Sequence, residues 1–246
     1  DKFSKKGDDI VNSNINSLEL TEKNIKQIYL DKEEINVDDI YLNLYESMFK
    51  REGNNLPTSA FLSMPSGIFK PQTSRLEEKN NSEIVPHYIE ENCINCNQCT
   101  LVCPHSVIRS YLLSKEEYEK APESIKNRCK KAIGLDDYYF TIGISIKNCT
   151  GCGLCIKTCP GMKGNKALTF NSYSDELKNK EQEIFNYLES NISNKNMLNK
   201  ATIKGLGFEK PNFEYCGACA GCGETAYIKI LTQLFKDNLV IANATG

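Results

Sequence analysis

Four stretches of the chain show hydrophobic patterns that predict β-strands. The clearest is Phe140–Ile146, in which an apolar residue occupies every second position. Two of the four strands flank each of two cysteine-rich loops, so the order strand, loop, short helix, strand occurs twice within residues 84–172. This repeat predicts an α+β domain with pseudo-two-fold symmetry over residues 76–172. The other three stretches are Val85–Ile89, Val107–Leu112 and Ala167–Phe170.

The segments around the repeat predict a helical insertion and an N-terminal extension. The charged segment Ser114–Lys131 lies between the two copies and predicts a helix that Pro122 interrupts. Residues 1–75 form the extension and its connector. Within them, apolar positions over 18–28 predict a helix with Thr21 as a candidate N-cap, and the glycines and prolines from residue 53 onward predict an extended connector.

The C-terminal part of the chain changes character twice. Residues 173–210 predict a linker, because the amphipathic pattern over 175–199 is typical of a helix that lies in solvent. Residues 211–246 combine helical spacing over Tyr227–Phe235 with a short apolar run, Leu239–Ala242, that predicts a buried strand. They predict the start of an α/β domain. Because this unit breaks off and the first residue is not methionine, we expect the chain to be a fragment of a longer protein.

Composition and charge exclude two classes of function. Hydrophobic residues make up 40% and charged residues 25% of the chain, as in ordinary globular domains. The net charge of −2 does not favour a nucleic-acid-binding surface, which needs clustered positive charge. No apolar run approaches the ~18 residues needed to span a bilayer. We therefore expect neither a nucleic-acid partner nor a membrane partner.

The twelve cysteines are the unusual feature of the composition. All but Cys129 fall into three groups with two-residue gaps, a spacing that indicates metal binding rather than a disulfide framework. The first two groups share the run C-x-x-C-x-x-C-x-x-x-C-P, which is typical of [4Fe–4S] clusters and in which the fourth cysteine ligates the other cluster. The crossed assignment gives Cys93, Cys96, Cys99 and Cys159 to cluster A, and Cys149, Cys152, Cys155 and Cys103 to cluster B.

Zinc is the alternative metal for these loops. Structural zinc sites usually join two C-x-x-C units across a longer gap, and mixed sites use histidine, of which this chain has 2. A tight run of three cysteines followed by C-P, occurring twice, therefore favours iron–sulfur clusters. The intervening glycines and apolar residues predict a site with little water and modest hydrogen bonding, and hence a low reduction potential.

The third cysteine group is incomplete as a cluster site. Cys216, Cys219 and Cys222 supply three thiols, and no cysteine follows them. Either this site is a weak mononuclear one, or its missing ligand lies beyond the last residue. Cys129, in the charged insertion, is interpreted as a half-buried or exposed thiol without a metal role. His105 is interpreted as a surface histidine or as a neighbour of a metal site.

Three sequence phrases resemble the C-terminal third of pyruvate:ferredoxin (flavodoxin) oxidoreductase, a thiamine-diphosphate enzyme. The resemblance covers about residues 50–246, and the phrases are ENCINCNQCTLVCPHSVIR, KNCTGCGLCIKTCP and FEYCGACAGCGETAYIKILTQLF. It implies a two-[4Fe–4S] ferredoxin-like domain followed by the start of a thiamine-diphosphate-binding domain. Cys216 departs from the family pattern, in which we expect a small hydroxyl residue.

The resemblance also implies cofactors, partners and an activity. Cys219 and Cys222 resemble the first ligands of a third, proximal [4Fe–4S] cluster, and Glu224 resembles a glutamate that contacts thiamine diphosphate, which is bound with Mg. The full-length enzyme would oxidise pyruvate to acetyl-CoA and CO2 and pass electrons to ferredoxin or flavodoxin. It would work as a homodimer with its remaining domains, in the cytoplasm or in a redox organelle of an anaerobic eukaryote.

Two other functions compete with this one. The chain could be a stand-alone two-cluster carrier or a subunit of another redox complex, against which the GACAGCGET phrase argues. It could also be a zinc-stabilised binding module, which metal analysis would distinguish. A variant of the oxidoreductase function fuses this chain to an NADP-reducing domain.

Overall fold

The computed structural model describes residues 7–24, 39–62, 64, 66–67, 69 and 73–242. The chain divides into two compact units, Asp1–Asp38 and Asp39–Gly246. The described part of the first unit is one helix, α1 (Asp8–Asn24). Thr21 lies inside this helix and donates a hydrogen bond from Oγ1 to the carbonyl of Ser17, 2.8 Å away, so its prediction as an N-cap was wrong. Residues 25–28 of the predicted helix lie outside the described residues.

The second unit begins with α2 (Asp39–Phe49). The connector after it was predicted to be extended, but its described part is a series of short 3-10 turns. Backbone hydrogen bonds between residues three apart close them, as from Leu56 N to the carbonyl of Gly53 at 3.1 Å. The turns cover Gly53–Asn55, Thr58–Phe61 and Thr73–Leu76.

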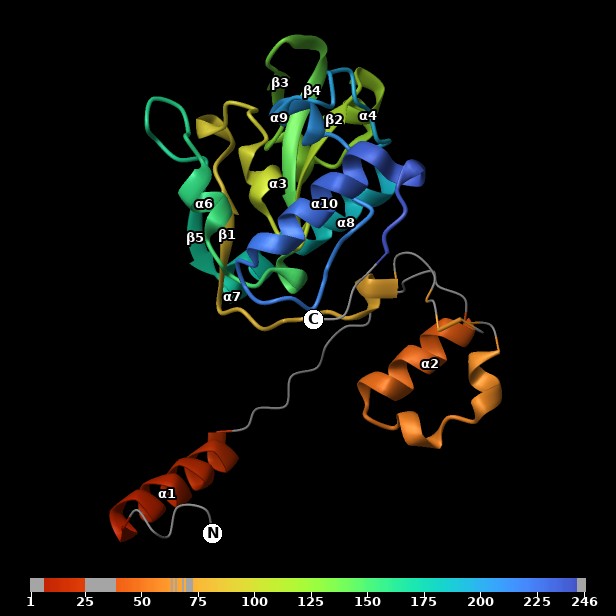
Figure 1. Ribbon diagram of the computed structural model, residues 1–246. Helices are drawn as coiled ribbons and strands as arrows, with labels where there is room; N and C mark the ends of the chain where they lie inside the picture. The colour runs from red at the N-terminus through yellow and green to blue at the C-terminus, as the bar shows by residue number, and fades with distance from the viewer. Residues whose placement is uncertain are drawn as a thin grey trace. The chain divides into compact units, whose positions relative to one another are not determined.

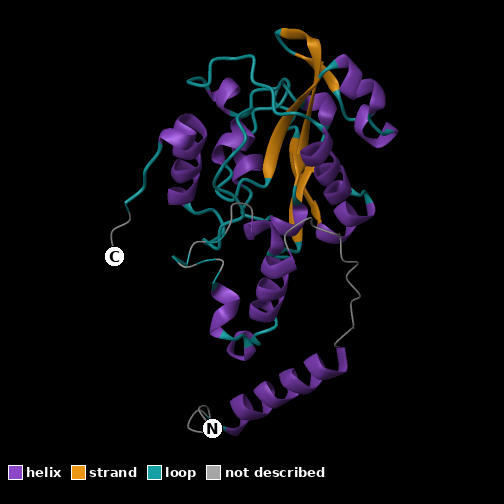
Figure 2. Cartoon of the chain, turned by 90° about the vertical axis from the view of Figure 1, so that its right-hand side faces the viewer, coloured by secondary structure: helices purple, strands orange, loops and turns teal. Residues whose placement is uncertain are grey.

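Two antiparallel sheets form the frame of this unit (Figures 1 and 2). The first pairs β1 (Ile84–Tyr88) with β5 (Leu168–Ser172). The second has the order β2-β4-β3 and consists of β2 (Ile108–Leu113), β3 (Lys130–Ala132) and β4 (Leu135–Ile144). The first strand of each predicted copy thus pairs with the last strand of the other, and all four predicted strands are present.

A short helix follows each cysteine-rich loop, as the repeat predicts. These helices are α3 (Gln98–Val102) and α6 (Leu154–Thr158), and they contact each other. The insertion also forms helices, α4 (Lys115–Lys120) and α5 (Glu123–Lys126), which are separated at Pro122. It does not stay helical to Lys131, because Lys130 and Lys131 pair with β4 as strand β3.

The segment predicted as a solvated linker helix packs into the core instead. It forms α7 (Tyr173–Lys178) and α8 (Glu181–Asn191), and the side chains of Phe185 and Leu188 are buried. Gly143 of β4 gives α8 its close approach, because a Cβ at Gly143 would stand 3.1 Å from Cδ1 of Leu188. The apolar face of the helix therefore faces the sheet, and the linker interpretation was wrong.

The C-terminal region forms α9 (Ile203–Leu206) and α10 (Gly223–Phe235). The run Leu239–Ala242 is not a strand, and Val240 is 92% exposed, so the prediction of a buried strand was wrong. No partner strand lies beside the run among the described residues. None of the described helices is long and apolar enough to cross a membrane.

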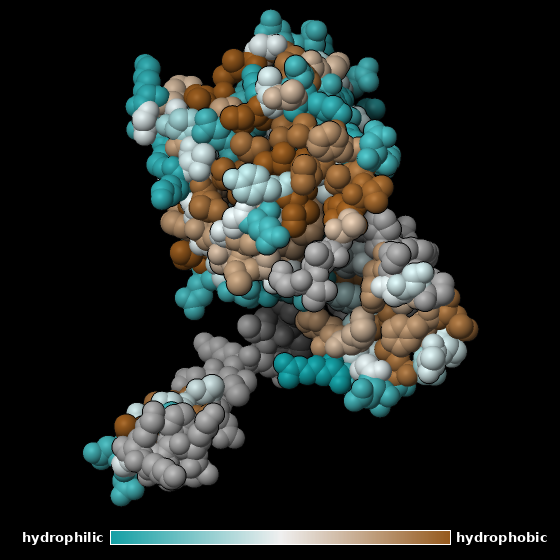
Figure 3. All heavy atoms as spheres, viewed as in Figure 1, coloured by the Kyte–Doolittle hydropathy of each residue, from teal (hydrophilic) through white to brown (hydrophobic). Residues whose placement is uncertain are grey.

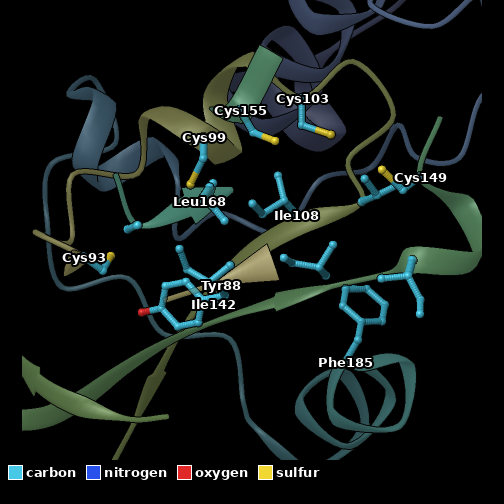
Figure 4. Packing of buried hydrophobic residues seen from close by; sticks show 14 of the residues in the cluster. Tyr88, Cys93, Cys99, Cys103, Ile108, Ile142, Cys149, Cys155, Leu168 and Phe185 are labelled. Carbon is cyan, nitrogen blue, oxygen red and sulfur yellow. The ribbon is translucent and has the colours of Figure 1, made fainter. Parts of the chain in front are cut away.

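The main core lies between the two sheets and the helices α3 and α6. Five cysteines belong to its buried apolar cluster, beside Ile108, Ile142 and Leu168 (Figure 4). In Figure 4, Cys93 and Cys149 lie at opposite ends of this region, with Cys99, Cys155 and Cys103 between them. The cysteine loops are thus built into the hydrophobic core.

Candidate functional site

The predicted cysteine sets lie around two cavities beside α3 and α6. Each cavity is lined by four cysteines, three from one cysteine run and the fourth from the other run. The empty spaces are similar, ≈ 320 Å³ and ≈ 360 Å³. Their lining matches the crossed sets, while ligation of iron by these residues stays a prediction. The first cavity, site A, is lined by Cys93, Cys96, Cys99 and Cys159, and the second, site B, by Cys103, Cys149, Cys152 and Cys155.

The backbone of each loop explains how three thiols face one cavity and the fourth faces the next. The residue before each helix, Asn97 or Gly153, has a left-handed backbone with φ of 61° or 73°. This turn brings the third cysteine round to the first two. The fourth, Cys103 or Cys159, directly follows its helix with an extended backbone, and so the chain carries its thiol toward the other site.

The thiols of both sites are mostly buried among apolar atoms. Burial and the neighbouring thiols raise the pKa of Cys99 well above its usual value, and they raise that of Cys149 to about 12. Four such thiols around one space become stable thiolates only beside a cation, which lowers their pKa by coordination. The donor set is four soft sulfur atoms in a dry cavity, which fits an iron–sulfur cluster.

A few N–H groups point at these sulfurs. Gly151 N lies 3.4 Å from Sγ of Cys149, and Ala167 N lies 3.4 Å from Sγ of Cys159. Lys130 stabilises the loop of site A, because its Nζ donates to the carbonyls of Glu90 and Cys93 at 3.0 and 2.6 Å. N–H···S contacts of this kind tune the reduction potential of a bound cluster.

The third cysteine loop lies against site B. A Cβ at Gly221 would stand 3.5 Å from Cβ of Cys152. Cys219 is exposed, and Cys222 is half-buried as the N-cap of α10, whose backbone N–H groups lower its pKa. No three histidine, cysteine, aspartate or glutamate side chains converge on a position for a single metal ion in the described chain.

Cys216 interacts with His105, across a gap of 111 residues. Sγ of Cys216 lies 3.2 Å from Nδ1 of His105. His105 lines site B and is only 1% exposed, so it neighbours a candidate metal site and is not a surface histidine. Burial lowers the pKa of His105. The sequence separation explains why this pair could not be found from the pattern of either loop.

Two other predicted residues line neither cavity. Glu224 is exposed in the first turn of α10. Cys129 is half-buried against an apolar cluster that includes Ile125 and Leu188, and burial raises its pKa to about 12. Cys129 is therefore the half-buried thiol that the sequence predicts.

Sequence reasoning missed Lys229, which lies on the buried side of α10. Its Nζ donates to the carbonyls of Thr100, Leu101 and Cys103 at 2.5, 2.8 and 2.8 Å. Burial lowers the pKa of Lys229 to about 8, while the charges of Cys103 and Cys99 oppose that shift. A lysine in an amphipathic helix normally indicates the solvent face, so the sequence carried no signal for this contact.

Comparison with known proteins supports the cluster interpretation. Residues 92–163 match the model of the 4Fe-4S dicluster domain family, a range that contains all eight cysteines of sites A and B. This match and the mixed helix and strand content agree with the predicted α+β class.

The predicted resemblance to pyruvate:ferredoxin oxidoreductase is confirmed by similar curated proteins. A pyruvate-flavodoxin oxidoreductase of Enterobacter agglomerans is 42% identical over 199 residues, covering 81% of this chain and 16% of that protein. A pyruvate:ferredoxin oxidoreductase of Moorella thermoacetica is 43% identical over 198 residues, covering 79% and 16%. A pyruvate dehydrogenase [NADP(+)] of Cryptosporidium parvum is 30% identical over 282 residues, covering 99% and 14%. The chain thus spans less than a fifth of the length of these relatives.

Proposed function

We propose that this chain is the electron-transfer part of a pyruvate:ferredoxin or pyruvate:flavodoxin oxidoreductase. The observation that carries the proposal is the pair of buried cavities, each lined by four cysteines drawn from both runs. The similarity to such enzymes over most of the chain supports it. The two copies of strand, loop, helix and strand are then pseudo-two-fold related halves of one dicluster domain, with site A and site B as its [4Fe–4S] positions.

The residues of the two sites would hold each cluster and protect it from water. A bound [4Fe–4S] cluster supplies one-electron transfer at low potential. The four thiolates of each set ligate the iron, and apolar side chains such as Ile142 and Ile108 line the cavities. Cys99 lies on the short helix α3 and Cys103 directly follows it, while the two residues line different sites. This arrangement supports electron transfer between the two clusters.

The C-terminal loop would connect these clusters to the chemistry of the whole enzyme. In this proposal Cys219 and Cys222 contribute to a third [4Fe–4S] cluster, and Glu224 contacts thiamine diphosphate bound with Mg. The contact of Gly221 with Cys152 supports the idea that electrons enter the dicluster domain at site B. The complete protein would oxidise pyruvate to acetyl-CoA and CO2, act as a homodimer, and reduce ferredoxin or flavodoxin in the cytoplasm or in a redox organelle.

Iron analysis of the anaerobically reconstituted chain tests the cluster assignment. We expect about eight irons per chain and a broad thiolate-to-iron absorption band. The crossed set is tested by comparing Cys103→Ala with Cys99→Ala, one cysteine directly after α3 and one within it. EPR should show that Cys103→Ala damages the cluster held by Cys149, Cys152 and Cys155, whereas Cys99→Ala damages the other one. Stoichiometric zinc without iron uptake, or damage to the same cluster in both variants, contradicts the assignment.

A further inference from the structure

Helix α10 packs with its polar side inward. The side chains that recur every four residues on its buried side are Thr225, Lys229 and Gln233, whereas Tyr227 and Leu231 of the opposite side are 71% and 43% exposed. Figure 3 shows apolar side chains gathered over this part of the molecule. An amphipathic helix normally buries its apolar face, so the buried polar side needs specific partners.

Lys229 finds its partners at the C-terminal end of α3, the helix that contains Cys99 and is directly followed by Cys103. All three of its ammonium protons are used by carbonyls, those of Thr100 and Leu101 near the end of α3 and that of Cys103, which follows the helix. These carbonyls have no partner within the helix, and lysine side chains commonly satisfy such groups. Lys229 therefore caps the helix that links site A, through Cys99, to site B, through Cys103.

The positive charge of Lys229 has no carboxylate partner among the described residues. Its side chain is 1% exposed, and a buried charge is costly unless an opposite charge lies nearby. Another buried cation, Arg109, shows the usual solution, because it is paired with Glu189 and Glu214. The acidic groups that interact electrostatically with Lys229 are the thiols of Cys103 and Cys99, which as cluster ligands would belong to two anionic iron–sulfur clusters.

We propose that Lys229 sets the reduction potential of the clusters in site A and site B by placing one buried positive charge at the C-terminal end of α3, next to Cys103. This inference rests on the proposed cluster binding. A fixed positive charge stabilises the reduced form of a cluster, which carries one more electron, and so it raises the reduction potential. Lys229 is a positioning residue here, because it touches the carbonyl of Cys103 and not the metal.

A redox titration of the reconstituted chain, followed by EPR at pH 7 with dithionite and mediator dyes, tests the proposal. Lys229→Met removes the charge and the hydrogen bonds, and Lys229→Gln removes the charge while keeping two N–H donors. In both variants we expect the equilibrium constant for reduction to fall about tenfold. This change lowers the reduction potential by 59 mV for a one-electron couple. The shift should be larger for site B, because Lys229 bonds directly to the carbonyl of Cys103.

Two controls separate charge from structure. Lys229→Arg keeps the charge and should leave both potentials close to those of the unchanged chain. Gln233→Leu removes buried hydrogen bonds from the same face of α10, to the carbonyls of Leu206 and Glu209, without changing a charge. It should leave the potentials unchanged.

The outcomes distinguish this inference from the proposed function. Unaltered potentials in Lys229→Gln with full iron content overturn the inference alone, as does an equal shift in Gln233→Leu. Absence of clusters from the unchanged chain overturns the proposed function and this inference with it. If Lys229→Met assembles fewer clusters, the comparison of Lys229→Gln with Lys229→Arg still decides between charge and packing.

Discussion

At the scale of single residues, backbone conformation determines how the cysteine loops close. The loop after Cys159 contains Gly161 and Gly164, with φ of 63° and 86°. A Cβ at Gly161 would stand 1.8 Å from the carbonyl oxygen of Asn165, whereas a Cβ at Gly164 would meet nothing within 4 Å. Both positions favour glycine for their left-handed backbone, but Gly161 also needs the missing side chain for space.

These two glycines provide a matched pair of alanine substitutions. Gly164→Ala should lower the free energy of unfolding by roughly 1–2 kcal/mol, the cost of a left-handed alanine. Gly161→Ala should cost clearly more, because the backbone of Asn165 must also move, and it should reduce iron uptake at site A. Urea unfolding and iron analysis of the reconstituted variants measure both effects. Equal stability of the two variants would show that the loop tolerates the extra methyl group.

At the scale of elements, the hydrophobic pattern of an amphipathic helix does not predict which of its faces is buried. The apolar residues of α8 indicate a helix but not its neighbour, and Gly143 creates the space for it only after β4 has formed. The apolar residues of α10 recur in the same way, yet this helix buries its polar side against α3. Period and polarity therefore predict that both helices exist, whereas tertiary contacts decide which face is buried.

The packing of α8 against the sheet predicts that substitution of a buried leucine lowers the stability much more than substitution of an exposed leucine nearby. Leu188 is fully buried, whereas Leu177 on the neighbouring helix α7 is 42% exposed. Leu188→Ala should lower the free energy of unfolding by about 2–5 kcal/mol, because it leaves a cavity against the sheet. Leu177→Ala should stay within about 0.5 kcal/mol. Denaturant unfolding of both variants checks this, and similar small losses would restore the interpretation of a solvated linker.

Replacing an apolar helix residue by a polar one usually destabilises a protein more than the opposite change. Because α10 buries its polar side, we expect the reverse order for this helix. Leu231→Ser on the exposed side should change the stability of this chain by no more than about 0.5 kcal/mol. Gln233→Leu makes a buried side chain apolar but removes the 2.6 Å hydrogen bond to the carbonyl of Glu209, and should cost about 1–3 kcal/mol. The unfolding midpoints of the two variants give the comparison. A larger loss for Leu231→Ser would mean that α10 buries its apolar side in solution.

At the scale of the whole molecule, a buried charge network joins segments that are distant in the sequence. Glu189 of α8 lies 2.7 Å from Arg109 of β2 and 3.0 Å from Arg75, and both arginines also pair with Glu214. The hydroxyl of Tyr111 donates to Glu189 at 2.6 Å. The network ties the segment before the dicluster region and the segment before the third cysteine loop to the same sheet.

The sequence predicts the cysteine sites better than it predicts the long-range pairs of side chains. The cysteine spacing predicted which cysteines line each cavity, because three of the four come from one tight local loop and the repeat indicates that the fourth comes from the other run. The pairs Arg109–Glu214 and Cys216–His105 join residues more than 100 positions apart. Each of these residues is ordinary in its own segment, so only the folded chain reveals the pairing.

The charge network predicts a specific dependence of stability on pH. Burial alone would raise the pKa of Glu189, but the charge of Arg109 and the hydrogen bond from Tyr111 outweigh it and lower the pKa to about 2. Because the folded pKa lies below the unfolded value of about 4.3, the folded state gains stability from this group at higher pH. That contribution is complete above about pH 5 and is lost as the pH falls toward 2.

The variant Glu189→Gln tests this dependence, with Glu183→Gln as its control on the same helix. In the described part of the chain, Glu183 pairs only with Lys180, in an exposed i,i+3 contact, so its substitution should change little. At pH 7, Glu189→Gln should be less stable than the unchanged chain by about 3 kcal/mol, because Arg75 and Arg109 lose a buried counter-charge. The difference between the two proteins should shrink steadily from pH 5 to pH 3.5. Glu189→Gln and the unchanged chain have the same cluster sites, so any loss of clusters in acid affects both proteins equally and cancels in the comparison. A stability difference that stays constant with pH would show that the network does not hold Glu189 as a carboxylate.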